Sequence, residues 1–549
     1  MYLMKKLRFF VAAILTSVFI VGCSESDSDN IQDVVYVITI EKDSLTLTPG
    51  GIAYIDFHIT PTDNLTSLNS DTVDNVIELR SVDQNKESEN YKISRVEQIT
   101  NGNTTLDSGH FRAYIEDLNQ KNNYDDNVQL VLKKNNGTQI FLSSAFNIRF
   151  LCDSKTRMLL DLGLSLVQIE TVNQEEPTCD YVSPPDSCWG ASIKNATKVP
   201  GRVVIMKDSC TLYNSGAFED GNSGMTIKIR GNTSAYGDKR PYKLKLQKKA
   251  DLLSRGDDKK YKDKDWLLIK YNGLNTLVGL KINELIGMQW TPSFEFVNVI
   301  VNGDYRGLYM LIESVKRNSD CRIDVSNTGY ILEYDAYWWN EDVYFVSDWA
   351  YPMNYTFKYP DEDEVTQEQI AYIKGYIDTL ENVIKEGGPY EQYIDVDSWA
   401  KWLLAHDILG TWDGGGSNMY LTKFDNTESS KLMMANLWDF DSNHWMVDTW
   451  AGQHGPYMYF SELLGNKNET FKNTYKALWS DLSPYIFKEM EDFLTEFETS
   501  QLAVAVDKSI EKDKDRWNTS FASISKDISI SKSWFSSRRI FLNNNIPDI

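Results

Sequence analysis

The chain has 549 residues, of which 42% are hydrophobic and 25% charged, and these ordinary values exclude wholesale disorder or a collagen-like structure. At roughly 150 residues per domain, the length suggests about three or four domains. Its 56 basic and 79 acidic residues give a formal net charge of −23, which repels phosphate backbones, so we expect no nucleic-acid partner. Only five histidines are present, which disfavours a histidine-rich metal site.

The first 30 residues have the features of an export signal. Basic residues over 5–8 precede an apolar stretch over 9–21 that is too short to span a membrane. The tetrapeptide Ile-Val-Gly-Cys that ends at Cys23 resembles the bacterial lipobox. We therefore expect a signal peptide over 1–22, a lipidated Cys23 and a polar tether over 23–30, although an ordinary signal peptide is an alternative. The predicted product is exported and held at the outer membrane or cell surface as a lipoprotein.

Five cysteines remain after Cys23, so at least one thiol is expected to be free. Cys179 and Cys188 flank a Pro-Pro turn and could form a disulfide. No C-x-x-C spacing occurs, so a structural zinc site of that kind is not expected.

Residues 31–150 have the pattern of an all-β domain. Residues 44–48 alternate with period two, which is typical of a half-buried strand. Two further alternating segments, 128–133 and 138–143, flank Asn136-Gly137, a strong hairpin signal. We predict one immunoglobulin-like β-sandwich without catalytic residues, which would act as a stalk or spacer, with adhesion as the alternative.

The pattern changes near residue 153 to a mixture of strands and helices. Strands are predicted over 225–230 and 242–246, and helices over 277–288, 366–386 and 397–411. Gly387 is expected to end the second of these helices, and Asp397 to cap the third. With a mainly helical C-terminal part, the sequence predicts an α+β domain over 155–549.

One cluster of acidic and amide residues suits metal chemistry. Asp413 is predicted to follow a helix end and to open a glycine run, and Asn418 lies five residues later, before an apolar strand. Asp439 and Asp441 are expected on the next strand, where residues i and i+2 share one face. Two carboxylates and an amide oxygen suit Mg²⁺ or Mn²⁺, and the third carboxylate could accept a proton from a hydroxyl group.

The same spacing occurs in phosphoryl-transfer enzymes. The catalytic loop of protein kinases has the motif D-x-x-x-x-N, as in Asp413 to Asn418, and a metal-binding Asp follows later in the chain. Spacing alone leaves alternatives open, including a turn with solvated acids or a calcium site at Asp439, Asp441 and Asn443. A glycoside hydrolase with Asp413 and Asp439 as its carboxylate pair is a further alternative.

Several segments together resemble the spore coat protein H (CotH) kinase family. They read MTIKIRGNTSAYGDKRPYKLKL at 225–246, DWLLIKYN from 265, FVNVIVNGDYRGLYMLIE up to 313, GYILEYDAY at 329–337 and LWDFD at 437–441. The resemblance covers about residues 160–545. It implies an atypical protein-kinase-like fold that transfers phosphate from ATP to protein. The layout also resembles that of lipoproteins from Bacteroides-like Gram-negative bacteria, in which such domains follow a β-sandwich.

The resemblance also implies roles for individual residues. Asp413 matches the catalytic Asp of the family, and Asp439 and Asp441 match its metal ligands. Asn418 would complete the metal site, and Trp438 is expected to stack on adenine.

A phosphate-binding lysine is implied on the basic strand that contains Lys243 and Lys245. These two side chains share one strand face, so the spacing does not choose between them, and a solvated strand face is the alternative. Glu284, on the helix predicted over 277–288, is the expected partner of that lysine.

The sequence therefore predicts an N-terminal all-β immunoglobulin-like sandwich and a CotH kinase-like α+β domain. The predicted activity is transfer of the γ-phosphate of ATP, with Mg²⁺ or Mn²⁺, to hydroxyl groups of a protein substrate or a cell-surface glycan. The predicted membrane attachment is through the lipid anchor. The alternative function is a non-catalytic surface binding or adhesion lipoprotein that retains the fold.

Overall fold

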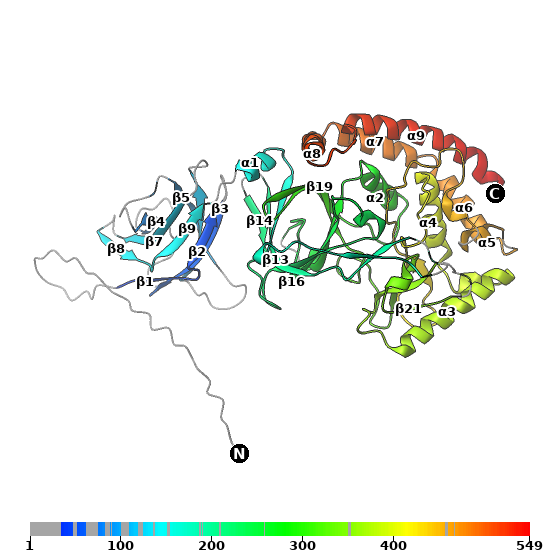
Figure 1. Cartoon of the computed structure of the whole chain (residues 1–549), viewed down its shortest axis with the longest axis horizontal. Coiled ribbons are helices and arrows are strands. Elements are labelled where there is room, and N and C mark those ends of the chain that lie inside the picture. The colour runs from blue at the N-terminus through cyan, green and yellow to red at the C-terminus, as the bar shows by residue number, and fades with distance from the viewer. Residues whose placement is uncertain are drawn as a thin grey trace, which may run out of the picture.

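The structure is a computed structural model, and it describes most of the chain from residue 35 onward (Figure 1). It describes residues 35–549 apart from 48–51, 62–74, 83–87, 89, 100–108, 119–123, 135–137, 151–153, 186–187, 189, 208–209, 257–258, 348, 350–352, 456–458 and 466. The predicted signal peptide, Cys23 and the tether lie outside the described residues. Within the described ranges, no helix has the length and apolar content needed to cross a bilayer.

The N-terminal part consists of two β-sheets that share one hydrophobic core. The strands are β1 (Val37–Ile40), β2 (Ser44–Leu47), β3 (Ile52–Thr60), β4 (Asn75–Ser81), β5 (Tyr91–Gln98), β6 (His110–Asp117), β7 (Tyr124–Lys134), β8 (Gln139–Leu142) and β9 (Phe146–Phe150). One sheet has the order β1-β3-β6-β5, and the other the order β2-β9-β7-β4 with β8 on β7. Phe57 and Phe111 of the first sheet are buried in the same core as Leu130 and Ile148 of the second. The predicted β7–β8 hairpin is confirmed, whereas the immunoglobulin-like class stays a prediction.

The next part of the chain forms a closed β-barrel. After α1 (Ser154–Leu160) come β10 (Ser165–Thr171), the small pair β11 (Asp180–Val182) and β12 (Ser192–Lys194), and then β13 (Val199–Lys207), β14 (Cys210–Asn214), β15 (Met225–Ile229), β16 (Tyr242–Ala250), β17 (Asp263–Lys270), β18 (Phe294–Val301) and β19 (Asp304–Glu313). The strand order is β10-β18-β19-β17-β16-β15-β13-β14. Because β10 pairs with β18 on one side and with β13 on the other, the sheet closes on itself. Alternate side chains fill its interior, as expected for a small barrel.

Closure depends on a glycine at the seam between β10 and β13. Gly201 pairs with Thr171, and a Cβ atom at residue 201 would lie 2.5 Å from the carbonyl oxygen of Glu170. Real Cβ atoms do not approach a backbone oxygen this closely. The absence of a side chain therefore lets the two strands meet.

The C-terminal part combines a second sheet with a set of helices. The sheet has the order β21-β22-β20-β23-β24, with β20 (Tyr330–Asp335), β21 (Tyr344–Phe345), β22 (Asn354–Tyr359), β23 (Met419–Lys423) and β24 (Leu432–Met434). The helices are α2 (Asn275–Leu285), α3 (Gln367–Glu386), α4 (Val396–Leu409), α5 (Tyr459–Gly465), α6 (Thr470–Leu482), α7 (Ile486–Glu498), α8 (Gln501–Trp517) and α9 (Ile524–Asn545). Buried residues of this sheet and of the helices form one large core with the outer barrel residues Leu267, Phe296 and Met310.

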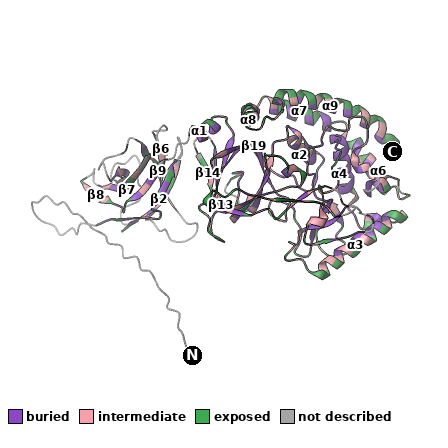
Figure 2. Cartoon of the chain, in the orientation of Figure 1, coloured by how far each residue is buried: buried purple, intermediate pink, exposed green. Residues whose placement is uncertain are grey.

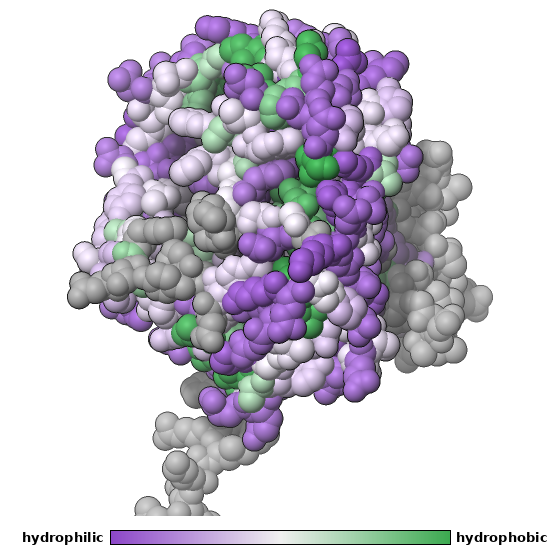
Figure 3. All heavy atoms as spheres, turned by 90° about the vertical axis from the view of Figure 1, so that its right-hand side faces the viewer, coloured by the Kyte–Doolittle hydropathy of each residue, from purple (hydrophilic) through white to green (hydrophobic). Residues whose placement is uncertain are grey.

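Buried residues lie where the sheets and helices face one another, and exposed residues lie on the outer faces of the helices (Figure 2). The helices α7, α8 and α9 run along one side of the molecule with their exposed residues outward (Figures 1 and 2). The face in Figure 3 is mainly hydrophilic and carries only scattered hydrophobic residues, in keeping with a net charge of −23.

The described helices confirm most of the predicted ones. Thr366 caps α3 in a capping box with Gln369, and Gly387 ends α3 in the left-handed conformation (φ 71°), as predicted. The predicted N-cap of α4 was wrong: Asp395, not Asp397, accepts the hydrogen bond from the backbone N–H of Ser398.

The possible disulfide between Cys179 and Cys188 does not form, because both are free thiols.

We predict that Gly201→Ala lowers the stability of the barrel, by about 1–3 kcal/mol, because the added Cβ separates β13 from β10. Urea unfolding followed by tryptophan fluorescence measures the effect, since all 15 tryptophans follow residue 188. Gly375→Ala is the control: it lies within α3 with no atom near the position of its Cβ, and should be neutral or stabilising. An unchanged midpoint for Gly201→Ala would contradict the role assigned to this glycine.

Candidate functional site

A cavity of about 1640 Å³ lies between the barrel and the second sheet. Barrel residues line it from β15, from the connection 230–241 and from the end of β17. The opposite wall comes from the end of β20 and from two loops, 412–418 and 438–441. The cavity therefore collects side chains from segments that are far apart in the sequence.

Most of the predicted site residues meet in this cavity. The lining includes Asp413, Asn418, Trp438, Asp439 and Asp441, all predicted from one cluster in the sequence. Lys243 also lines the cavity, from the barrel side. The two remaining predicted residues, Lys245 and Glu284, are not among the residues that line it.

The loop that contains Asp413 is held from both sides. Helix α4 ends at Leu409, and Ser442 accepts a hydrogen bond at its Oγ from the backbone N–H of Asp413 (3.3 Å). The Asn418 amide donates from Nδ2 to the backbone carbonyl of Asp413 (3.2 Å), and Ser417 donates to buried Asp335 at the end of β20. These bonds leave the Asp413 carboxylate exposed at the cavity.

The end of α4 beneath this loop is itself anchored by distant residues. The Asp407 carboxylate accepts a hydrogen bond from Tyr475 (2.8 Å) and faces His454 (2.9 Å). Fully buried Arg538 of α9 donates from Nε to the backbone carbonyl of Asp407 (2.6 Å) and from Nη1 to that of Thr449 (2.6 Å).

The strand predicted for Asp439 and Asp441 was wrong. Strand β24 ends at Met434, and Asp439 has a left-handed backbone (φ 59°), which is incompatible with a continuing strand. The loop is fixed instead by Phe440, whose ring lies over Gly279 of α2, where a Cβ atom would come within 2.0 Å of it.

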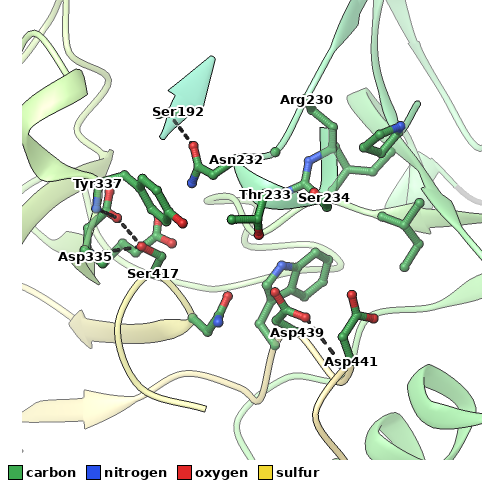
Figure 4. A pocket seen from close by; sticks show the side chains of 18 of the residues that line it. Ser192, Arg230, Asn232, Thr233, Ser234, Asp335, Tyr337, Ser417, Asp439 and Asp441 are labelled. Carbon is green, nitrogen blue, oxygen red and sulfur yellow. Dashed lines mark hydrogen bonds between the residues drawn. The ribbon is translucent and has the colours of Figure 1, made fainter. Parts of the chain in front are cut away.

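The two carboxylates still lie close together. The Asp441 backbone N–H donates to Oδ1 of Asp439 (3.4 Å), and Asn272 donates from Nδ2 to Oδ1 of Asp441 (2.6 Å). Figure 4 shows Asp439 and Asp441 side by side in the pocket.

The surroundings of Asp439 strongly perturb its carboxyl group. Burial and, to a smaller extent, the nearby carboxylates of Asp441 and Asp413 together raise the pKa of Asp439 to about 7. Nearby Arg230 acts in the opposite direction but does not offset them. Three carboxylates thus meet here with too little positive charge around them, which is a site that a cation would stabilise.

The barrel side of the cavity is basic. Lys228, Arg230 and Lys270 line it, and none of them forms an ion pair within the part of the chain that the structure describes. Burial lowers the pKa of Lys228, and repulsion by Lys243 adds to this. Burial also lowers the pKa of Lys270, while Asp441 opposes the shift. Such cations suit an anionic ligand.

The structure distinguishes the two predicted lysines. The ammonium of Lys243 pairs with buried Asp265 of β17 (3.1 Å), which fixes it at the cavity wall. Lys245 is exposed and lies farther along β16. Glu284 is also exposed and pairs with Lys281 one helical turn earlier (3.0 Å), so the acidic partner of Lys243 is Asp265 instead.

Several cavity residues were not predicted from the sequence. The turn between β15 and β16 places Arg230, Thr233 and Ser234 on one side of the pocket, and Asp439 and Asp441 face them from the other (Figure 4). Residues 230–234 lie in the segment 225–246 that carries the family resemblance, but their residue types alone do not indicate a particular chemistry. Lys270 and Asn272 have no distinct signal in the sequence, because they lie at and just after the end of an ordinary buried strand, β17.

The comparison with protein families agrees with the sequence resemblance. The family model described as CotH kinase protein matches residues 227–542, more than half of the chain. The chain belongs to the CotH kinase family. No curated protein matches it. Membership indicates a kinase-like fold for the matched part.

The CotH match begins after the barrel has started. Strands β10 and β13 precede residue 227, yet β10 pairs with β18 and β13 pairs with β15 inside the matched part. The segment from residue 165 onward is therefore structurally part of the same barrel as the CotH match.

The donor set of the cavity fits a hard divalent cation. The carboxylates of Asp439 and Asp441 and the side-chain amide of Asn418 can provide oxygen ligands, and partly buried Asp439 forms no ion pair within the described part of the chain. Carboxylate and amide oxygens are the ligands that Mg²⁺ and Mn²⁺ prefer.

We predict that Mn²⁺ binding tightens as pH rises through 7. The pKa of Asp439 is raised in the folded protein, so its protonated form persists to about pH 7 and competes with the cation. From pH 6 to pH 8 the deprotonated fraction rises roughly tenfold, and affinity measured by calorimetry should rise by a similar factor. Asp439→Asn should remove most of this dependence. An affinity that does not vary with pH in the wild type would contradict the prediction.

Proposed function

We propose that the protein is a metal-dependent phosphotransferase that passes the γ-phosphate of ATP to a hydroxyl group of a protein or a cell-surface glycan. One observation carries the proposal: a single cavity of a CotH-family chain places three carboxylates opposite several cations. Acidic residues on one side suit metal binding, and basic residues on the other suit phosphates. Phosphoryl transfer requires both.

Asp439, Asp441 and Asn418 would hold Mg²⁺ or Mn²⁺. When bound, the ion would neutralise charge on the phosphate oxygens. The chain's own residues supply the rest of the phosphate site. Lys243 and Arg230 would bind phosphate oxygens from the barrel side, and the hydroxyl groups of Thr233 and Ser234 line the same wall.

Asp413 would act on the acceptor. Its carboxylate is exposed at the cavity and would accept the proton of the acceptor hydroxyl as that oxygen bonds to the γ-phosphorus and the bond to the β-phosphate oxygen breaks, releasing ADP. Trp438 lines the cavity beside Asp439 and would stack on the adenine.

We predict different losses for the two kinds of acid. Asp413→Asn should lower turnover by about 100-fold or more with little loss of ATP affinity, because its role is in the transition state. Asp439→Asn should weaken metal-dependent ATP binding. Lys243→Met should weaken ATP binding by about tenfold, whereas Lys245→Met should not, since only Lys243 lines the cavity. ATP binding and transfer of labelled phosphate to a casein-like acceptor are measured on the same preparations.

The matched lysine pair separates a phosphate site from a general loss of positive charge. Equal effects of Lys243→Met and Lys245→Met would count against the proposed site. If the wild type binds neither Mg²⁺–ATP nor Mn²⁺–ATP at millimolar concentration, the alternative of a surface binding or adhesion protein replaces the kinase.

We also propose that the chain is an exported lipoprotein of a Bacteroides-like bacterium, anchored at Cys23, with an immunoglobulin-like domain over 31–150 between the membrane and the CotH domain. The lipobox-like sequence supports the anchor, and the two-sheet core supports the spacer. Cys23→Ala should abolish partitioning into the detergent phase after expression in a Gram-negative host, because the lipobox then has no thiol to carry the lipid. Partitioning that is unchanged in this variant would disprove the anchor.

A further inference from the structure

A histidine pair lies on the outer face of the N-terminal sheet β1-β3-β6-β5. Strands β3 and β6 are antiparallel, and His58 lies directly opposite His110. Their sequence neighbours Phe57 and Phe111 point into the core, so both imidazoles are on the opposite, outer face. Glu41, which immediately follows edge strand β1, reaches the same place.

The three side chains converge through specific atoms. Both His58 Nε2 and His110 Nε2 lie 3.1 Å from Oε1 of Glu41. The two rings are stacked, with centroids 4.1 Å apart and planes inclined by 15°. Each residue offers one metal-binding atom, and these three atoms lie within 4.8 Å of one another.

Hydrogen bonding alone does not satisfy this arrangement. Nε2 of His110 is buried from solvent and, among the residues that the structure describes, has no hydrogen bond of acceptable geometry, even though it lies near the carboxylate. If both rings were protonated, two stacked cations would share one carboxylate, and like charges directly opposite on a sheet are destabilising. If His110 were neutral with Nε2 unprotonated, its lone pair would face a carboxylate oxygen. A cation between the three atoms removes both conflicts.

We propose that Glu41, His58 and His110 form a binding site for a divalent transition metal ion, with Zn²⁺ as the best fit. Zn²⁺ binds imidazole nitrogen and carboxylate oxygen at roughly 2.0–2.2 Å, so tetrahedral ligand atoms lie about 3.3 Å apart. The two nitrogen–oxygen separations, each 3.1 Å, are close to this spacing, and the stacked rings would turn toward the ion so that both lone pairs point at it. Mg²⁺ and Ca²⁺ prefer oxygen ligands and fit less well.

The surroundings of the site favour three protein ligands and an open fourth position. The side chain of Glu41 is 41% exposed, and those of His58 and His110 are 35% and 20% exposed. Water can therefore reach the fourth position, or a donor from another molecule can fill it. The ligands come from the segment after β1 and from β3 and β6, three neighbouring strands, so the ion would tie the edge strand to the middle of the sheet.

This site is separate from the cavity and does not depend on the proposed kinase activity. None of its three residues lines the cavity. The neighbouring outer-face residues Asp56 and Arg112 form an ion pair with each other (2.7 Å). They therefore do not compete for the atoms of the histidine pair and Glu41.

The test is a titration of the full mature chain with Co²⁺ and Zn²⁺. The intense visible bands of a tetrahedral Co²⁺ complex are expected to saturate at one equivalent, and Zn²⁺ is expected to abolish them by displacing the ion, whereas Co²⁺ on the oxygen ligands of the cavity would give no such bands. His58→Gln, His110→Gln and Glu41→Gln should each weaken binding by about 100-fold or more, because each removes a ligand. Glu116→Gln, which removes a carboxylate from the outer face of β6 outside the cluster, should bind as the wild type does.

Asp439→Asn serves as the control for the cavity and should leave the Co²⁺ spectrum unchanged. Circular dichroism of each variant without metal checks its fold, and His58→Gln, at the more exposed histidine, is the variant to rely on if His110→Gln unfolds. A wild type without a tetrahedral Co²⁺ spectrum would overturn the proposal. So would equal Zn²⁺ affinities for the wild type and His58→Gln.

Discussion

The contact between Phe440 and α2 is the constraint on which the rest of the site depends. The ring lies over Gly279, and the residues on either side of it are Asp439 and Asp441. Helix α2 directly follows barrel strand β17, so this contact places the acidic loop against the barrel. On the other side, Ser442 binds the loop that contains Asp413. One short segment therefore holds three carboxylates in place relative to the barrel.

Most charged side chains of the cavity lie on opposite walls and do not form ion pairs with one another. Lys243 is paired with Asp265 and Lys239 with Asp513, whereas the acids at 413, 439 and 441 have no ion pair among the described residues. Most of the opposing charges thus remain available across the cavity. Repulsion between the neighbouring carboxylates destabilises the folded protein when no ligand is bound. A ligand that brings positive charge to the three acids would relieve this repulsion.

The sequence predicted local features well and long-range pairings poorly. The helical spacing of apolar residues and the capping residues were enough to predict α3, because both signals lie within one segment of the chain. The cluster from Asp413 to Asp441 could be predicted because its residues are close in the sequence.

Closure of the barrel could not be predicted, since it requires Ser165 to pair with Val297, which is far away in the sequence. The sequence does not indicate the left-handed backbone of Asp439 either, because an Asp residue adopts this conformation only where its tertiary contacts stabilise it. The low histidine count gave no signal for the pair on β3 and β6, because only the strand register places His58 opposite His110.

The buried guanidinium of Arg538 has a consequence for the order in which the molecule is made. It supports the end of α4 by binding the carbonyl of Asp407, a residue 131 positions earlier in the chain. A chain that is still leaving the ribosome lacks this support until residue 538 has emerged, even though every acidic residue of the cavity has been synthesised by then. The strands of the barrel, in contrast, are all complete at Glu313. A chain that ends just before residue 538 would therefore contain every acidic residue of the cavity but would lack this support for the end of α4.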